Sequence, residues 1–246
     1  APVPVFANGD NFIVSKDNYY NPFGVDFGTD RVSGANNGDF NTRFTTLGYR
    51  RYVYNTYNLQ VTPGLRGSFG ESSWQWDAAV NYGKMRQKSV NYGFLDYAGF
   101  QQGLGPSYRD ASTGQVTCGT PGNPIAGCTP INIFNVNDPT TIAALKNIQR
   151  NPATTTEYTV KQFEANANGN LFELPAGMVN LATGFSYRKE STSTRTDPLA
   201  VADLNGLCGV VEFCSSVLAG SFNVKEAYAE TLIPLLSGKP WAQTLN

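Results

Sequence analysis

The chain has 246 residues and a net charge of −1, and only 15% of its residues are charged, against ~25% in ordinary soluble domains. The balanced charge argues against a nucleic-acid-binding surface, and no run of about 20 apolar residues is present to form a membrane helix. Because the chain contains no histidine, His-based acid–base catalysis and most zinc sites are excluded.

The first predicted strand follows an irregular region. Residues 1–48 are rich in Asn, Gly and Asp, show no helical period and are expected to form a loop region. A long strand is then predicted over Arg50–Phe69, with a break at Pro63, because proline cannot donate a ladder hydrogen bond. After a tight turn at residues 70–73, a second strand is predicted over about Trp74–Arg86.

This second strand alternates apolar and polar side chains. The segments Trp74–Tyr82 and Phe163–Leu171 both place apolar or small residues on one face and Asp, Glu, Asn or Gln on the other. In a transmembrane β-barrel, an apolar face meets lipid, a polar face meets the water-filled lumen, and aromatic residues lie at the rims. The expected lipid-facing residues are Trp74, Trp76, Ala78, Val80 and Tyr82, and the expected lumen-facing residues are Gln75, Asp77 and Asn81.

A very long connection at residues 88–156 precedes the third strand. Within it, the run Pro139–Lys146 is predicted to form a short helix with Asp138 as its N-cap. Further strands are predicted at Tyr158–Leu171, Met178–Glu190 and Phe222–Leu235, with another beginning at Trp241. The expected short turns are residues 174–177 and 234–240, and residues 192–220 form a second long loop.

Short turns therefore alternate with long loops, which is typical of outer-membrane barrels and is not expected of a β-sandwich. The sequence predicts an all-β fold, an antiparallel transmembrane β-barrel segment of about five to six strands with long extracellular loops. We expect one domain over residues 1–246, with residues 1–48 as an extracellular loop region and residues 49–246 as strands, periplasmic turns and outer loops. Because two edges stay unpaired, the segment is not expected to close a barrel by itself.

The cysteines form two short-range pairs in loop-like sequence rich in Gly, Pro and Ser. The expected disulfides join Cys118 to Cys128 and Cys208 to Cys214, both in extracellular loops, which suits an oxidising compartment. The alternative is a set of free thiols in a reducing compartment. A metal site is not expected, because the spacings do not match CxxC and no histidine accompanies them.

Three stretches of the sequence resemble TonB-dependent outer-membrane receptors. They are Tyr20–Val25, Gly64–Phe69 followed by Trp74–Asp77, and, as the most specific, Asn223–Leu235 with its proline turn. The resemblance runs from about residue 20 to the end of the chain. It implies a barrel of about 22 strands with an N-terminal plug. Such receptors import scarce ligands, namely siderophores, cobalamin or oligosaccharides, through the outer membrane of a Gram-negative bacterium.

The resemblance also implies the partners of the protein. These are outer-membrane lipid, the rest of the barrel and its plug, the imported ligand, and an inner-membrane energy-transducing protein that pulls on the plug. No plug sequence precedes Ala1, no TonB-box-like segment is present and no terminal aromatic strand ends the chain, so an internal piece of a receptor is expected. The alternative is a non-transporting surface β-protein, such as an adhesin or a shed structural component.

Function in such a barrel is expected on the lumen face and in the outer loops. The possible ligand contacts are the loop aromatics Tyr92, Phe94, Tyr97, Phe100 and Tyr108 and the lumen residues Gln162, Glu164, Asn166 and Arg188. The aromatics could stack on a sugar or a flat chelate, or instead pack within a folded loop, and the polar residues could merely solvate the lumen. The carboxylates Glu71, Asp77, Glu226 and Glu230 give no support for a glycosidase pair at the required spacing, so neither an enzyme nor a cofactor is expected.

Overall fold

The computed structural model describes residues 12–28, 38, 44–203 and 207–246. Within these residues the fold consists mainly of antiparallel strands, which confirms the predicted all-β class. The parts of the expected loop region at residues 1–11, 29–37 and 39–43 lie outside the described residues. No helix in the described part of the chain is long and apolar enough to span a bilayer.

Contacts divide the chain into two compact units, each made of three segments. Unit 1 comprises residues 1–55, 88–155 and 195–217, and unit 2 comprises residues 56–87, 156–194 and 218–246. Most of the long connections lie in unit 1 and most of the strand residues in unit 2. The expectation of one domain over residues 1–246 stays a prediction.

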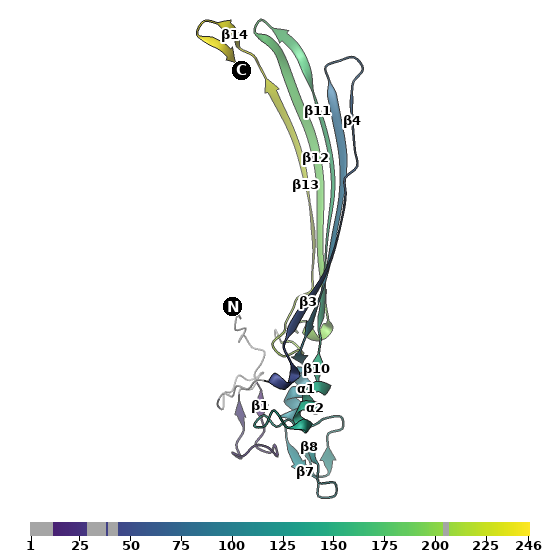
Figure 1. Cartoon of the computed structure of the whole chain (residues 1–246), viewed down its shortest axis with the longest axis vertical. Helices are drawn as coiled ribbons and strands as arrows, with labels where there is room; N and C mark the ends of the chain where they lie inside the picture. The colour runs from purple at the N-terminus through teal and green to yellow at the C-terminus, as the bar shows by residue number, and fades with distance from the viewer. Residues whose placement is uncertain (1–11, 29–37, 39–43, 204–206) are drawn as a thin grey trace. The chain divides into compact units, whose positions relative to one another are not determined.

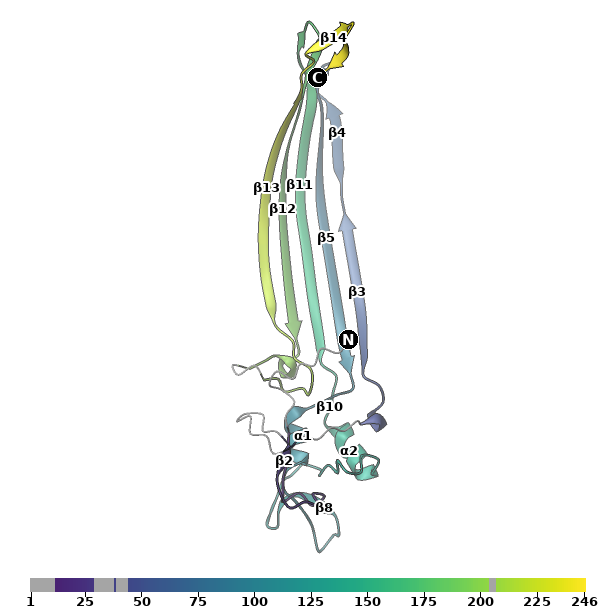
Figure 2. The same ribbon diagram turned by 90° about the vertical axis from the view of Figure 1, so that its left-hand side faces the viewer.

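Unit 2 is built from the greater part of a six-stranded sheet. The strands of this sheet are β3 (Arg51–Val61), β4 (Gly64–Ser68), β5 (Gln75–Tyr92), β11 (Ala153–Leu174), β12 (Gly177–Thr196) and β13 (Leu218–Leu232). They lie side by side in the order β13-β12-β11-β5-β3, with β4 also paired to β5 (Figures 1 and 2). Strands β3 and β13 are the two edges, so the sheet formed by the described residues is open.

The break predicted at Pro63 separates β3 from β4. The Pro63 carbonyl still accepts a hydrogen bond of 2.9 Å from the Val80 amide, although the residue has no N–H to donate. Pairing with β5 then resumes at Gly64, which lies opposite Ala79, and continues to Ser68 opposite Gln75. Proline therefore interrupts the strand without changing which strand it pairs with.

Strands β5, β11 and β12 extend further than the sequence predicted. They contain 18, 22 and 20 residues, respectively. The added parts of β11 and β12 are rich in threonine and serine, which left no apolar–polar alternation to detect. Thr156 and Thr194 lie 3.1 Å apart between their hydroxyl oxygens, so these polar extensions are paired with each other.

The chain end in unit 2 differs from the prediction. Residues 234–240 were expected to form a turn, but Leu236–Lys239 is strand β14, which pairs with β15 (Ala242–Leu245). The tight connection of this hairpin therefore lies at Pro240 and Trp241, where proline is tolerated because no ladder hydrogen bond is required.

Side-chain contacts identify the two faces of the sheet in unit 2. Asn166 contacts both Asp77 and Tyr228, so β11, β5 and β13 share one polar face. On the opposite face, a Cβ added at Gly67 would meet the ring of Trp76. The predicted alternation of β5 is therefore present, with Asp77 and Trp76 on opposite faces.

We call these surfaces the polar face and the apolar face. The polar face contains Gln60, Thr62, Arg66, Asp77, Asn81, Gln162, Glu164, Asn166, Arg188, Glu226 and Tyr228. The apolar face contains Leu65, Trp76, Ala78, Val80, Tyr82, Phe163, Ala165, Phe185 and Ala227. Both sets follow from the alternation of side chains along each strand and from the registers of the paired strands.

Unit 1 folds around a compact hydrophobic cluster. Its elements are β1 (Ile13–Val14), β2 (Phe27–Gly28), η1 (Thr45–Leu47), β6 (Phe94–Leu95), α1 (Tyr97–Gly103), β7 (Ser107–Arg109), β8 (Val116–Thr120), β9 (Asn123–Pro124), α2 (Pro139–Asn147), β10 (Gln149–Arg150) and η2 (Pro198–Ala200). Phe100, Leu104 and Leu145 are buried together with Val14 and Ile131. The long connection is therefore an ordered core and not a structureless loop.

The two helices of unit 1 are capped in the same way. Helix α2 begins after Asp138, whose carboxylate accepts the Thr140 and Thr141 amides at 3.1 Å each, as the sequence predicted. Helix α1 begins after Asp96, whose carboxylate accepts the Gly99 amide at 2.8 Å. The sequence did not predict α1, because its seven residues include two glycines, which are poor helix formers.

Both disulfides of unit 1 join the cysteines paired by sequence. Cys118 is bonded to Cys128 with a Cα–Cα distance of 5.9 Å, and Cys208 is bonded to Cys214 at 5.6 Å. Cys118 lies on β8 and is fully buried, so the first bridge anchors the connection after β9 to a three-stranded sheet.

Candidate functional site

The polar face of unit 2 brings together side chains from all six strands of the sheet. Three of the predicted lumen residues, Gln162, Glu164 and Asn166, lie there on β11, at alternate positions of one strand. Gln60 and Thr62 lie beside Asn81 on the same face. The short connection after Phe69 pairs β4 with β5, and β3 continues this pairing on the other side of the break at Pro63. The face therefore results from the pairing of segments far apart in the chain.

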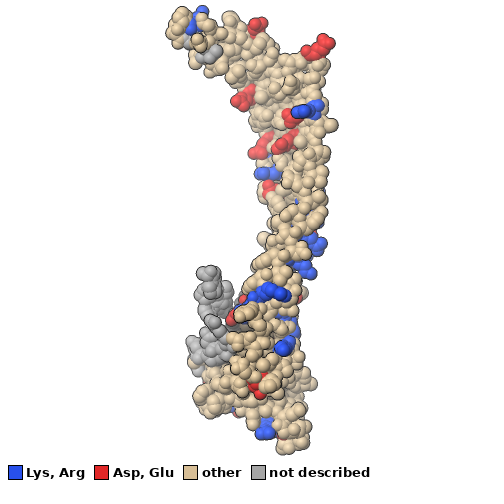
Figure 3. Space-filling model, viewed as in Figure 1, with Lys and Arg blue, Asp and Glu red and all other residues tan. Residues whose placement is uncertain are grey.

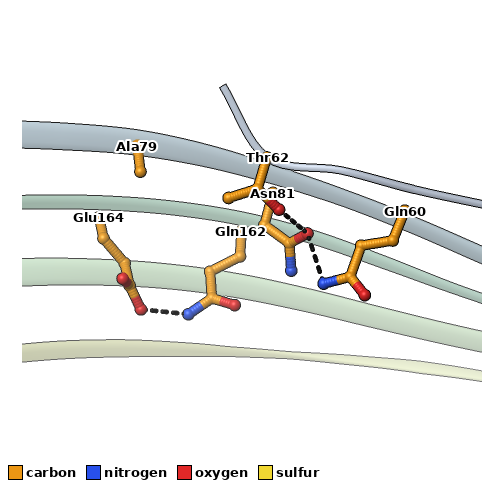
Figure 4. A pocket seen from close by; sticks show the side chains of 6 residues that line it. All are labelled: Gln60, Thr62, Ala79, Asn81, Gln162 and Glu164. Carbon is orange, nitrogen blue, oxygen red and sulfur yellow. Dashed lines mark hydrogen bonds between the residues drawn. The ribbon is translucent and has the colours of Figure 1, made fainter. Parts of the chain in front are cut away.

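A hollow of about 170 Å³ lies at the centre of this face. Its lining residues are Gln60, Thr62, Ala79, Asn81, Gln162 and Glu164. Figure 4 shows the Asn81 amide oxygen between two donors, the Gln60 amide at 3.3 Å and the Thr62 hydroxyl at 3.0 Å. On the facing strand, the Gln162 amide donates to Glu164. The hollow thus presents amide, hydroxyl and carboxylate groups around one small alanine side chain.

A hydrogen-bonded chain of side chains crosses the sheet next to the hollow. The Asn166 amide donates to the Asp77 carboxylate at 2.9 Å, and the Tyr228 hydroxyl donates to the Asn166 oxygen at 3.2 Å. Gly184 lies beneath this chain, and a Cβ at that position would overlap both Asn166 and the Tyr228 ring. Glycine is therefore required for Tyr228 to reach across β12 to Asn166.

A second polar group on this face contains the predicted contact Arg188. Its guanidinium lies 3.1 Å from Glu190, which also accepts a hydrogen bond from the Tyr158 hydroxyl. Beside them, the Ser186 hydroxyl donates to Glu226 at 3.2 Å. The Arg188 charge is therefore partly neutralised, while its side chain keeps 43% of its surface exposed.

The predicted aromatic contacts belong to unit 1. Phe94 is fully buried and Phe100 is 3% exposed, so neither ring can stack on a ligand, which corrects the sequence-based expectation. Tyr97 stacks on Phe12 with ring centroids 4.9 Å apart. The sequence analysis left packing within a folded loop as the alternative to ligand stacking, and these three rings are packed in that way. The physical reason is that the connection has a core of its own to fill.

Tyr92 and Tyr108 are partly buried and also belong to unit 1. The Arg51 guanidinium lies 4.8 Å from the Tyr92 ring centroid, which is the geometry of a cation–π contact. Tyr108 lies on β7 opposite Thr117. The Tyr92 ring therefore already has a protein partner, and the Tyr108 side chain is only partly exposed.

Several polar-face residues were not predicted as site residues. Gln60 and Thr62 lie within the predicted strand Arg50–Phe69 but were not singled out, and Tyr228 lies only within the stretch that carries the resemblance. Their role depends on which strands pair and in which register. The sequence signal that could have identified Tyr228 is its register with Gly184, a glycine in a strand that faces a large aromatic residue.

The chemistry of the polar face is that of a hydrogen-bonding surface. Amides and hydroxyls offer both donors and acceptors, and Asp77, Glu164 and Glu226 add anionic acceptors. No group of three or more potential metal-binding side chains is found among the described residues. The expectation that the chain is not an enzyme stays a prediction.

The chain was compared with known proteins. No family model, no curated protein and no solved structure matches the chain.

Proposed function

We propose that this chain is part of the β-barrel of an outer-membrane receptor that takes up a scarce ligand. The observation that carries the proposal is the two-faced sheet of unit 2, which has exposed apolar side chains on one face and a hydrogen-bonded polar network on the other. Leu65, Val80 and Phe185 keep 74%, 51% and 43% of their surface exposed on the apolar face. Single exposed apolar residues are ordinary in soluble proteins, but a contiguous apolar face needs a cover.

Lipid is the cover that this sheet suits best. A strand needs about 9–11 residues to cross the hydrocarbon of a bilayer, and β5, β11 and β12 contain 18, 22 and 20 residues. The polar network would then line a water-filled lumen, where its amides and carboxylates remain solvated. In a soluble sheet, by contrast, the apolar face would require a second protein layer.

The open edges of the sheet support the same proposal. Exposed sheet edges do not occur in hydrocarbon, because their backbone groups have no partners there. Strands β3 and β13 would therefore pair with further strands to complete a closed barrel. The plug, the inner-membrane energy-transducing protein and the outer-membrane location belong to this proposal through the resemblance to TonB-dependent receptors.

The polar face limits the kind of ligand that suits this lumen. The amides of Gln60, Asn81 and Gln162 and the hydroxyl of Thr62 can exchange hydrogen bonds with a hydroxyl- or amide-rich molecule. A siderophore, cobalamin or an oligosaccharide all have such groups. The polar face therefore supports uptake of a polar ligand and does not choose among the three.

Lipid contact can be tested with the tryptophans of unit 2. We would reconstitute the chain carrying Trp74→Phe and Trp241→Phe, which leaves Trp76 as its fluorophore, into vesicles containing brominated phosphatidylcholine. Trp76 fluorescence is expected to be strongly quenched, because its ring would lie on the lipid-facing side. The matched control carries Trp74→Phe and Trp76→Phe, which leaves Trp241 as the fluorophore.

Two outcomes would overturn the proposal. One is a Trp76 fluorescence that brominated lipid does not reduce. The other is a chain that stays monodisperse as a closed monomer in buffer without detergent, with β3 bonded to β13. The alternative, a non-transporting surface β-protein, would pass the quenching test, and only failure of the complete protein to support ligand uptake would favour it.

A further inference from the structure

The strands of unit 2 carry a second pattern, a row of basic residues beyond the apolar residues of the apolar face. Its members are Lys84 and Arg86 on β5, Lys161 on β11, Lys189 on β12 and Lys225 on β13. In each strand the basic residue lies between the apolar residues and the long connection. The four strands are neighbours in the order β13-β12-β11-β5. Lys161 and Lys189 line one hollow, and Lys225 lies opposite Tyr187, two positions along β12 from Lys189.

Most carboxylates of these strands lie on the polar face, together with Arg66 and Arg188, whereas the basic row lies on the apolar face. The carboxylates Asp77, Glu164, Glu190, Glu226 and Glu230 share the parity of the polar face. Beside the basic row, the apolar face has the carboxylate of Glu157, which lies 3.5 Å from Lys84 and 3.4 Å from Arg86. In the view of Figure 3, acidic side chains lie mainly toward the upper part of the strands and basic ones become more frequent further down.

Two of the basic residues line a hollow of about 210 Å³ on this face. Lys161 and Lys189 lie there with the hydroxyl side chains of Thr159, Ser191 and Ser221. Ser191 is directly opposite Ser221 in the pairing of β12 with β13. Among the described residues, neither lysine has a carboxylate partner. The hollow therefore combines two unneutralised ammonium groups with three hydroxyl donors.

We propose that this hollow binds the phosphate group of an anionic membrane lipid. Two ammonium groups and several hydroxyls match the charge and the hydrogen-bond acceptors of a phosphate. The site adjoins the apolar residues of the same face, so a bound headgroup would have its acyl chains against Phe163 and Phe185. Basic residues next to an apolar membrane band attract anionic headgroups in the same way. The inference rests on the proposed function, because it needs lipid at the apolar face.

Mixed micelles provide the test. The full chain in dodecyl maltoside would be titrated with dioleoyl phosphatidic acid, with dioleoyl phosphatidylcholine and with inorganic phosphate, and binding followed by thermophoresis. Phosphatidic acid is expected to bind, and Lys161→Gln/Lys189→Gln is expected to weaken its binding about 10- to 30-fold. The matched variant Arg66→Gln/Lys239→Gln removes the same charge elsewhere in unit 2 and is expected to change binding less than about twofold.

The outcomes separate the possible ligands. Equal loss in both double variants would show that only net charge matters and would overturn the site. Equal affinity for inorganic phosphate and for phosphatidic acid would show a site for free phosphate and would overturn the lipid assignment. Equal binding of phosphatidylcholine would show that the phosphate charge is not recognised. Circular dichroism of each variant confirms that the sheet is intact, so a folding defect is not read as lost binding.

Failure of this inference is distinguishable from failure of the proposed function. If Trp76 is quenched by brominated lipid but phosphatidic acid does not bind, the membrane assignment stands and the lipid site is wrong. If Trp76 is not quenched, the apolar face has no lipid on it and both proposals fail.

Discussion

The two units of this chain differ in the burial of their apolar side chains: unit 1 buries many of them, whereas unit 2 leaves many exposed. In unit 1, Phe94, Leu104 and Leu145 are completely buried, and the disulfides close its loops. In unit 2, Val179, which is 3% exposed, is the one buried hydrophobic side chain among the described residues. Water can therefore stabilise unit 1 by the hydrophobic effect, whereas unit 2 depends mainly on backbone pairing and on whatever covers its apolar face.

This difference predicts that the same substitution lowers the free energy of unfolding more in unit 1 than in unit 2. Phe100→Ala in unit 1 is expected to lower the free energy of unfolding by about 3–5 kcal/mol, because it leaves a cavity in a packed core. Phe163→Ala in unit 2 is the matched control, since its ring is 40% exposed. We would measure urea unfolding in detergent by hydrogen exchange, peptide by peptide. Equal losses at the two positions would contradict the comparison.

The second prediction concerns the apolar face of unit 2 in lipid. Val80→Arg is expected to destabilise the chain in vesicles by up to about 2–4 kcal/mol, the cost of arginine facing lipid near the bilayer centre. Asn81→Arg, one residue along β5, is the control, because it points to the polar face and keeps its charge solvated. Unfolding would be followed by tryptophan fluorescence in phosphatidylcholine vesicles. A larger loss for Asn81→Arg would reverse the assignment of the faces.

The third prediction tests whether loss of a disulfide in unit 1 destabilises that unit alone. Replacing both Cys118 and Cys128 by serine is expected to cost about 2–3 kcal/mol, from the loop-closure entropy of a loop of this length. The loss should appear as faster hydrogen exchange around β8 and β9 in unit 1. Exchange in the paired parts of β12 and β13 should stay unchanged. Loss of protection in both units at once would show that they unfold together.

Sequence reasoning predicted those features that depend on neighbouring residues. The alternation of β5, the break at Pro63, the cap at Asp138 and the two disulfides are all set by residues close together in the chain. Periodicity, proline chemistry and short loops are local properties, so one sequence is enough to detect them.

The remaining features depend on contacts between distant residues. The Ile13 amide donates to the Gln101 side chain across 88 positions, and Phe12 packs edge-on against Phe100 at 4.6 Å. These contacts bury the aromatic residues that had been expected to face a ligand. Similarly, Tyr228 joins the polar face only through the register of β13 on β12. A residue type alone indicates that a ring needs a partner, but not whether the partner is the core or a ligand.

The smallest predicted effect concerns the start of α2 in unit 1. The hydroxyl of Thr140 and the amide of Thr141 donate to Asp138 and hold the pKa of its carboxyl below its ordinary value of 3.8. A carboxyl whose pKa is lower in the folded state stabilises the fold above its ordinary pKa, and this contribution is lost as the pH falls through the lowered pKa. Asp138→Ala is expected to remove the cap and cost about 0.5–2 kcal/mol at neutral pH.

The matched variant Asp138→Asn sharpens this last prediction. Asparagine caps a helix about as well as aspartate but does not titrate, so the variant should keep the helix start and lose its dependence on pH in the acid range. The amide signals of Thr140 and Thr141, followed by NMR from pH 6 to about pH 2, should shift in the native chain and stay constant in the variant. If the native amides do not respond below the ordinary aspartate pKa, the carboxylate does not form the cap. Thr62 and Gly64, on either side of Pro63 in unit 2, serve as a reference. Their amide signals should not shift in the same titration, because the described residues of unit 2 contain no capped helix.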